Sequence, residues 1–245
     1  MSYALVLPFT YEPYFEACKA TIKLDPERVL IVDNRPPHNM GIMRAHNLGV
    51  EFMQRLGADW LIILSAAIRF GAYGGLDFAE LLDEKLDHYV VHGATDNVLG
   101  GRQQTAVSGG PNGVFGWHLT AFRSTLFDRI GVWDENFSPY GLDDIDLSLR
   151  IQKEYHGAPG WNTYPCDVTD TTMAHSLNLA GVKSAYPPRN AYFTRKWGRD
   201  GADWQNDGYA HPFNDESHPL SWWPEPDHPL SIWRNEYSGE WSYDD

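Results

Sequence analysis

The sequence has few basic residues for its length. Its 245 residues include 19 Lys and Arg against 33 Asp and Glu, which gives a formal net charge of −14. Proteins that bind nucleic acid without sequence preference, or that attach to anionic lipid, need a basic surface. The charge balance therefore disfavours direct binding to unmodified nucleic acid and to anionic membranes.

Cysteines and long apolar runs are scarce as well. Cys18 and Cys166 form neither a CxxC pair nor a metal-ligand spacing, so we expect two reduced thiols. No apolar run approaches the roughly 20 residues that a membrane span requires. The first apolar run has no preceding positive region and ends at Pro8, which predicts a strand rather than a signal peptide. We therefore expect a soluble, cytoplasmic protein.

Hydrophobic residues are plentiful and regularly placed. They make up 42% of the chain, which predicts a packed globular protein. Aromatic residues make up 14%, including 10 Trp and 13 Tyr. Sugars and bases stack on aromatic faces, so some of these rings are candidates for a ligand surface. Core and tail packing explain any single ring equally well.

Apolar strands alternate with amphipathic helices along the first half of the chain. Segments that are apolar throughout, separated by helical periods, indicate a largely parallel sheet covered on both faces. We therefore expect one Rossmann-like α/β domain over residues 1–201, followed by an irregular aromatic and Pro-rich tail over 202–245 that packs on it. The expected strands are 3–7, 28–32, 60–64, 88–92 and 117–122, and the expected helices are 14–22, 43–56, 78–86, 124–130 and 142–155.

The ends of the first three strands are the first candidate site. In sheets of this kind, ligands bind at the carboxyl ends of the strands. These ends carry Thr10, Asp33-Asn34 and Ser65-Ala66-Ala67. A carboxylate at Asp33 is suited to accept hydrogen bonds from a base or a ribose, and equally to cap the following turn.

A second candidate is the acid cluster in the segment GLDDIDLSLR. Asp143, Asp144 and Asp146 stand at the start of a helix, where the helix dipole favours carboxylates. The spacing predicts that Asp146 pairs with Arg150 on the helix surface and that Asp143 serves in capping. Repulsion among three acids would raise one pKa, which suits a general base. An acid-rich capped helix without catalytic function is the alternative.

Two further sites lie downstream. His175 is isolated in the sequence, and an isolated His is more often structural than functional. Arg195 and Lys196 precede Trp197, and two adjacent cations in an acidic protein are suited to hold a phosphate. An ordinary solvated basic pair is the alternative.

Taken together, these segments resemble the family 2 glycosyltransferases of the GT-A fold, especially the rhamnosyltransferase-like and phage-encoded branches. The resemblance covers most of residues 3–199. It is carried by IVDN (31–34), MRAHNLGVEF (43–52), IGVWDENFSPYGLDDIDLSLR (130–150) and KWG (196–198). The third block follows the family pattern closely, with Asp143 where Glu is usual.

The resemblance implies roles at the donor end of a site. Thr10 and Asp33 would hold the nucleotide, with Asp33 reading the base or the ribose. Arg44 and Asn47 would lie near the base and the diphosphate. UDP or dTDP is the donor nucleotide that Asp33 favours in this family, and GDP stays open.

The resemblance also implies the chemistry. Asp144 matches the base that deprotonates an acceptor hydroxyl, which then attacks the anomeric carbon and inverts it. Asp143 would orient the acceptor, and His175 would contact a metal ion or the diphosphate. Lys196, with Arg195, would neutralise the leaving group. The acceptor class stays open among glycans, proteins and modified bases, and so does a homo-oligomeric state.

One departure from the family stands out. The family places Asp-x-Asp, which binds Mn²⁺ or Mg²⁺, where this chain has Ser65-Ala66-Ala67. Ser is a poor ligand for these ions and Ala is none. A metal-independent transferase is one explanation, with charge supplied by the cations Arg44, Arg69, Arg195, Lys196 or His175. The others are a residual metal site at Asp144 and His175, an engineered replacement, or an inactive relative.

The inactive relative would be a nucleotide-sugar or glycan-binding module. Its interaction surface would be the aromatic tail, which contains Trp222, Trp223 and Trp233. Replacing Asp144 separates the two classes, because only an enzyme has turnover to lose. A nucleotidyltransferase is a weaker third hypothesis, because it needs a metal-binding acid pair where Ser65-Ala66-Ala67 stands.

Overall fold

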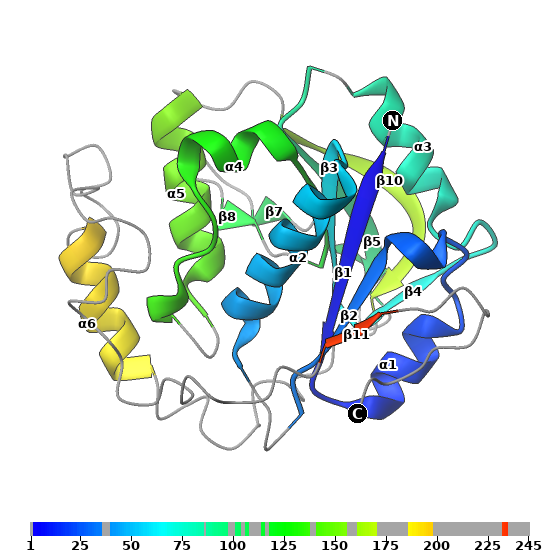
Figure 1. Ribbon diagram of the computed structural model, residues 1–245, viewed down its shortest axis with the longest axis horizontal. Helices are drawn as coiled ribbons and strands as arrows, with labels where there is room; N and C mark the ends of the chain where they lie inside the picture. The colour runs from blue at the N-terminus through cyan, green and yellow to red at the C-terminus, as the bar shows by residue number, and fades with distance from the viewer. Residues whose placement is uncertain are drawn as a thin grey trace.

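The computed structural model describes residues 2–35, 40–85, 87–97, 101–103, 106–107, 114–115, 118–137, 141–155, 161–170, 186–197 and 232–234. Helices and strands alternate through the first hundred residues (Figure 1). The elements are β1 (Tyr3–Phe9), α1 (Glu12–Lys19), η1 (Pro26–Arg28), β2 (Val29–Asp33), α2 (Ile42–Leu56), β3 (Trp60–Leu64), β4 (Ile68–Phe70), α3 (Leu76–Glu84), β5 (Val90–Asn97), β6 (Gly101–Gln103), β7 (Ala106–Val107), β8 (Val114–Phe115), β9 (Leu119–Arg123), α4 (Ser124–Ile130), η2 (Glu135–Phe137), α5 (Asp143–Tyr155), β10 (Trp161–Asp170), α6 (Tyr186–Trp197) and β11 (Ile232–Arg234).

Nine of the described strands form one large mixed sheet, and β7 and β8 form a separate two-stranded sheet. The order of the large sheet is β11, β2, β1, β3, β9, β5, β10 and β4, with β6 paired to β5. β1 runs parallel to both of its neighbours, β2 and β3, and β5 runs parallel to β10. β9 lies antiparallel between β3 and β5. The prediction of an α/β domain with a mostly parallel central sheet is confirmed.

The two faces of the sheet carry separate cores. In β1, Ala4 and Val6 pack against the α2, α4 and α5 side. Leu5, Leu7 and Phe9 pack on the opposite face against α1 and α3. Figure 1 shows these two helix groups on the two sides of the sheet. This alternation places helices on both faces, so the strands are apolar throughout.

Helix α2 approaches β1 very closely at Gly49. A Cβ atom built at Gly49 would lie 2.6 Å from the Val6 Cγ1 atom, which is closer than side chains pack. The helix ends at Gly57, which adopts a left-handed conformation with φ of 60°. The predicted end of this helix at Gly57 is therefore confirmed.

Several predicted element bounds shift. The helix expected over 14–22 is α1 (Glu12–Lys19), and the strand expected over 88–92 is β5 (Val90–Asn97). From the predicted tail the structure describes residues 232–234, which form β11 and pair antiparallel with β2. The division into a domain and a tail stays a prediction. No helix among the described residues has both the length and the apolar character to cross a bilayer.

Candidate functional site

Three strand ends that the sequence singled out meet at one edge of the sheet. Phe9 and Asp33 are register partners at the ends of β1 and β2. β3 lies beside β1 in parallel, so Ser65, just after β3, comes to the same edge. Thr10 follows Phe9 and is half-buried. The carboxyl edge therefore gathers Thr10, Asp33 and Ser65 as the strand pattern predicts.

Asp33 is buried and already paired. Its carboxylate accepts bonds from the Arg35 Nε at 3.0 Å and the Arg35 Nη2 at 2.7 Å, and from the Arg35 backbone N–H at 2.8 Å. Arg35 also reaches Glu12 at 3.1 Å, and its guanidinium lies 5.2 Å from the Phe9 ring centroid. Asp33 thus caps a turn, as one alternative predicted. A nucleobase that hydrogen-bonds to the Asp33 carboxylate has to share it with Arg35.

Ser65 shapes a tight turn after β3. Its backbone carbonyl accepts from the Ile68 N–H at 3.0 Å, and its Oγ accepts from the Ala67 N–H at 3.2 Å. Its own N–H donates to the His118 carbonyl at 2.8 Å. The hydroxyl is therefore engaged in an ST turn, in which a side chain stabilises local backbone. Ala67 supplies no ligand atom.

Arg69 is anchored on this turn. Its Nη1 donates to the carbonyls of Ala66 and Ile68, both at 2.7 Å. The guanidinium lies 5.9 Å from the Tyr14 ring centroid, and the side chain is partly exposed. The nearby Cys18 is buried, and burial raises the pKa of its thiol to about 12. This thiol is therefore not a nucleophile near neutral pH.

The three acids at the start of α5 have different proton affinities. Burial, followed by the charge of Asp144, raises the pKa of Asp143 to about 7. Burial also raises the pKa of Asp144, against the Ile145 N–H and the nearby His118, which lower it. Burial acts on Asp146 too, but Arg150 and Lys196 lower its pKa overall. The prediction of a raised pKa is confirmed, with burial as the larger cause.

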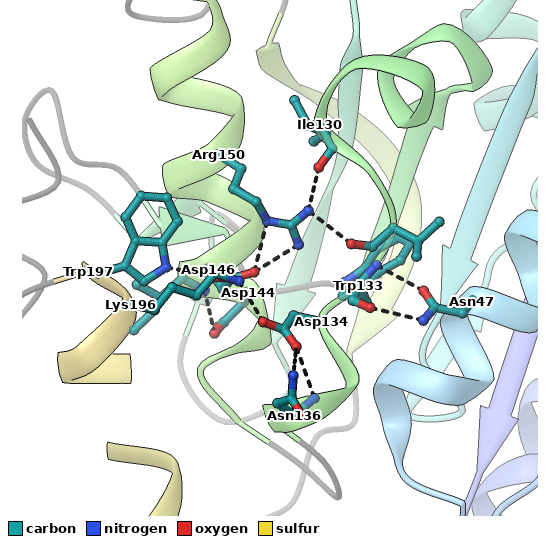
Figure 2. Close-up of polar contacts among 12 residues, drawn as sticks. Asn47, Ile130, Trp133, Asp134, Asn136, Asp144, Asp146, Arg150, Lys196 and Trp197 are labelled. Atoms are coloured by element: carbon teal, nitrogen blue, oxygen red, sulfur yellow. Dashed lines mark hydrogen bonds and ion pairs between the residues drawn. The ribbon is translucent and has the colours of Figure 1, made fainter. Parts of the chain in front are cut away.

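Asp146 belongs to a buried ion network (Figure 2). It bonds Arg150 at 2.8 Å and Lys196 at 2.8 Å, and Lys196 also bonds Asp134 at 2.6 Å. Two acids and two bases make this group neutral. The predicted pairing of Asp146 with Arg150 is confirmed, but its predicted place on the helix surface is wrong, because both side chains are about 1% exposed.

The network fastens α5 and α6 to the segment before α5. Arg150 donates to the carbonyls of Ile130 and Val132 at 2.7 and 2.9 Å. The Trp197 Nε1 donates to Asp146 at 2.8 Å, as Figure 2 shows. Lys196 is 1% exposed, so the alternative of a solvated basic pair is wrong for this residue. Its charge is balanced by the carboxylates of Asp134 and Asp146 inside the protein.

The turn before α5 has unusual backbone geometry. Gly141 has φ of 95°, and Leu142 has φ of 66°, the one positive φ at a non-glycine residue among the described residues. The Asp143 Oδ1 accepts from the Gly141 N–H at 3.2 Å. A left-handed Leu costs roughly 1–2 kcal/mol, and such strain gathers at functional sites. The turn sets the direction in which Asp143 and Asp144 enter the helix.

Asn47 and Arg44 on α2 contact the same region from the other side. The Asn47 amide donates to the Trp133 carbonyl at 3.0 Å and to Glu135 at 2.7 Å, and its Oδ1 accepts from the Trp133 N–H at 2.9 Å. Arg44 pairs with Glu51 at 3.5 Å and Glu135 at 3.4 Å. Asn47 thus holds the 133–135 segment in place, and Figure 2 shows its pairing with Trp133.

The sequence did not single out His118. Its carbonyl receives the Ser65 N–H, and its side chain interacts electrostatically with Asp144. His118 therefore connects the turn after β3 with the acids of α5. A pattern in the sequence gives no sign of this, because the three residues are far apart in the chain. The pairing of β9 with β3 brings His118 beside Ser65.

The remaining predicted residues carry less structural information. His175 lies outside the described residues, and of Arg195 the structure describes only its place in α6. Within the described ranges, no three His, Cys, Asp or Glu side chains gather as a metal site would require. Ser65 and Ala67 do not fit the metal ion that the Asp-x-Asp position implies.

Comparison with solved structures shows the fold. S. aureus TarS 1-349 in complex with UDP matches with a TM-score of 0.51 and 13% identity over 82% of this chain and 73% of that chain. The complex of TarS 1-349 with UDP-GlcNAc matches with a TM-score of 0.50 and 12% identity, over 71% of this chain and 59% of that chain. The mannosyltransferase PcManGT of Pyrobaculum calidifontis with GDP-Man and Mn²⁺ matches with a lower TM-score of 0.47 and 14% identity, over 78% of this chain and 61% of that chain.

These likenesses establish the fold and nothing finer. The mixed sheet with helices on both faces is the GT-A arrangement that the sequence predicted. No protein-family profile matches the chain, and no curated protein is significantly similar to it.

Proposed function

We propose that the protein is an inverting glycosyltransferase that moves a sugar from a nucleoside diphosphate donor to an acceptor hydroxyl, with Asp144 as the general base. The observation that carries this proposal is the pair Asp143 and Asp144. Both have a raised pKa, and both follow a strained turn at the start of α5, the helix that also carries Asp146 and Arg150 of the ion network. Proton affinities of this kind, next to an acid of lowered pKa, are typical of acid–base sites.

Asp144 suits the role of base better than Asp143. Asp144 is partly exposed, whereas Asp143 is buried and its Oδ1 is bonded to the Gly141 N–H. One Asp144 oxygen accepts from the Ile145 N–H at 2.8 Å. The carboxylate is therefore oriented, and it reaches the surface where an acceptor would lie. Asp143, whose own pKa is raised by burial and by the charge of Asp144, helps to orient the acceptor.

The reaction needs one proton transfer and one displacement. The acceptor hydroxyl gives its proton to the Asp144 carboxylate, and its oxygen forms a bond to the anomeric carbon from the face opposite the leaving group. The bond from that carbon to the diphosphate oxygen breaks, and its electron pair leaves with the nucleoside diphosphate. Attack from the opposite face inverts the anomeric configuration.

The donor nucleoside would lie at the edge that carries Thr10 and Asp33. The TarS structures with UDP and UDP-GlcNAc share this fold, which favours a uridine nucleotide here. A dTDP-sugar is the next candidate, and GDP follows. The transferred group would be a hexose, and the acceptor a hydroxyl on a glycan, a protein or a modified base.

One observation favours a second function, a nucleotide-sugar or glycan-binding module without turnover. Ser65 and Ala67 offer no metal ligands where the family binds its metal ion. The intact acid pair favours the enzyme. The two functions differ in a single measurable property, the release of nucleoside diphosphate.

The test is an assay of nucleoside diphosphate release from UDP-, dTDP- and GDP-sugars, with glycan and glycopeptide acceptor pools. We expect one donor to be turned over. The variant Asp144→Asn should lower kcat about 10²- to 10⁴-fold while keeping donor affinity. Asp128→Asn, an exposed residue on α4, is the matched control and should keep full turnover. Equal turnover in both variants would contradict the role of Asp144. Donor binding without turnover under any condition would favour the binding module.

A further inference from the structure

The turn after β3 is complete without a metal ion. The Ser65 hydroxyl accepts a hydrogen bond from the Ala67 N–H, and the Ser65 carbonyl accepts one from the Ile68 N–H. Ala67 is 8% exposed and has no polar side-chain atom. A divalent cation at this position would find one weak oxygen ligand, where Mg²⁺ needs octahedral oxygen coordination. The turn therefore requires another source of positive charge if a diphosphate binds there.

Arg69 brings positive charge to this turn. Its Nη1 donates both hydrogens to the carbonyls of Ala66 and Ile68, and these two bonds fix the plane of the guanidinium. No described residue accepts a hydrogen bond from its Nε or Nη2, and no described carboxylate pairs with it. The N–H groups that remain form the planar fork that matches a phosphate.

The neighbouring candidate cations are bound elsewhere. Lys196 is held between Asp134 and Asp146. Arg44 is paired with Glu51 and Glu135, and Arg35 with Asp33 and Glu12. These pairs balance the charge of each cation within the protein. Arg69 differs from them because its partners are neutral carbonyls, which leave its full positive charge available.

The position of Arg69 suits a leaving group. The Ser65 N–H donates to the His118 carbonyl, and the His118 side chain interacts electrostatically with Asp144. Arg69 stands at the other end of the same turn, near Tyr14 at the start of α1. An inverting displacement needs its base and its leaving-group cation on different sides of the sugar. The turn is linked through His118 to the proposed base at its Ser65 end, and it carries Arg69 at its other end.

We propose that Arg69 binds the donor diphosphate directly and replaces the divalent cation, so that the site works without a metal ion. This inference rests on the proposed function, because it deepens the account of the same donor site. The guanidinium is pre-organised by its two carbonyl bonds, so little side-chain entropy is lost when the diphosphate binds. Its charge also disfavours a divalent cation at the same place.

Calorimetric titration with UDP, UMP and uridine tests this proposal, each in EDTA and again in Mn²⁺. Wild-type protein should bind UDP equally well in both. Arg69→Ala should weaken UDP roughly tenfold to hundredfold, as expected for a lost charge-assisted contact, and leave uridine nearly unchanged. Arg69→Lys should keep part of the UDP affinity, because it keeps the charge but loses the fork.

Arg55→Ala is the control for the loss of one positive charge. Arg55 lies at the end of α2 that leads into β3, so it is at the opposite edge of the sheet, and its side chain is 65% exposed. It should leave UDP affinity unchanged, and thermal unfolding of each variant checks that it is folded. UDP binding that requires Mn²⁺, or that survives Arg69→Ala, would overturn the inference and leave the proposed transferase standing. Absence of UDP, dTDP and GDP binding under both conditions would overturn both.

Discussion

The four aspartates between residues 134 and 146 differ in their roles because their surroundings differ. Asp134 and Asp146 lie inside the protein and pair with Lys196, and Arg150 and Lys196 lower the pKa of Asp146. Asp143 is equally buried, no cation among the described residues pairs with it, and burial raises its pKa to about 7. Asp144 reaches the surface. The same side chain thus supplies structure in two places and a candidate base in another.

The raised pKa of Asp143 predicts how the free energy of unfolding depends on pH. The pKa of Asp143 is raised from 3.8 to about 7 on folding, so between these values the folded protein holds a proton that the unfolded chain has lost. The protonated Asp143 carboxyl therefore contributes its full share to the free energy of unfolding below pH 4, and this contribution is lost as pH rises through about 7. Asp143→Asn should raise the free energy of unfolding relative to wild type at pH 8, by on the order of 2–4 kcal/mol, with little difference at pH 4.

Chemical denaturation at pH 4, 6 and 8 measures this difference. Asn keeps the oxygen that accepts from the Gly141 N–H, so the turn is preserved. Asp128→Asn, at an exposed position, should show no such trend. A stability difference between Asp143→Asn and wild type that stays constant from pH 4 to 8 would contradict the burial of this charge.

The elements show what the sequence could and could not predict. The apolar runs predicted β1, β2 and β3 nearly to the residue, because each is buried on both faces. No sequence pattern indicated that β9 runs antiparallel between β3 and β5. Strand order depends on pairings between distant segments, and hydrophobic periodicity reports only on the local chain.

The same limit applies to the site. The four-residue spacing predicted that Asp146 pairs with Arg150, because residues i and i+4 are neighbours on a helix. Their burial depends on Asp134 and Lys196, which are 62 residues apart in the chain. That distance is why the alternative of a solvated basic pair was wrong for Lys196. The strand-end rule, by contrast, correctly brought Asp33 and Ser65 to one edge, because it describes the whole sheet.

The ion network between α5 and α6 gives a prediction at the scale of elements. Lys196→Met leaves Asp134 and Asp146 with Arg150 as their remaining cation in the network. An uncompensated buried charge costs about 3–5 kcal/mol of unfolding free energy. Arg129→Met breaks an exposed pair with Glu154 and should cost less than about 1 kcal/mol.

Urea denaturation compares the two variants, and UDP titration of folded Lys196→Met protein separates structure from donor binding. We expect a large loss of stability with UDP affinity within about twofold of wild type, because the Lys196 ammonium is turned toward carboxylates in the interior. Weakened UDP binding at unchanged stability would instead assign Lys196 to the leaving group.

The whole chain is acidic, and the proposed donor site lies at one edge of its α/β sheet. The buried ion network is neutral, so the net charge of −14 comes from the rest of the chain. Anionic donors therefore approach against a negative average field, and they need local positive charge to bind. The edge supplies it through Arg69, next to the turn that replaces the metal-binding acids.

Hydrogen–deuterium exchange with and without UDP, dTDP or GDP tests the central claim, that this edge is the donor site. We predict that one of the three nucleotides slows exchange at the ends of β1 and β2, in residues 9–11 and 33–35, and in the turn at 65–69. The N-terminal edge around Gly57 and Asp59 should not change. Slower exchange confined to other regions, or none with any of the three, would contradict the account.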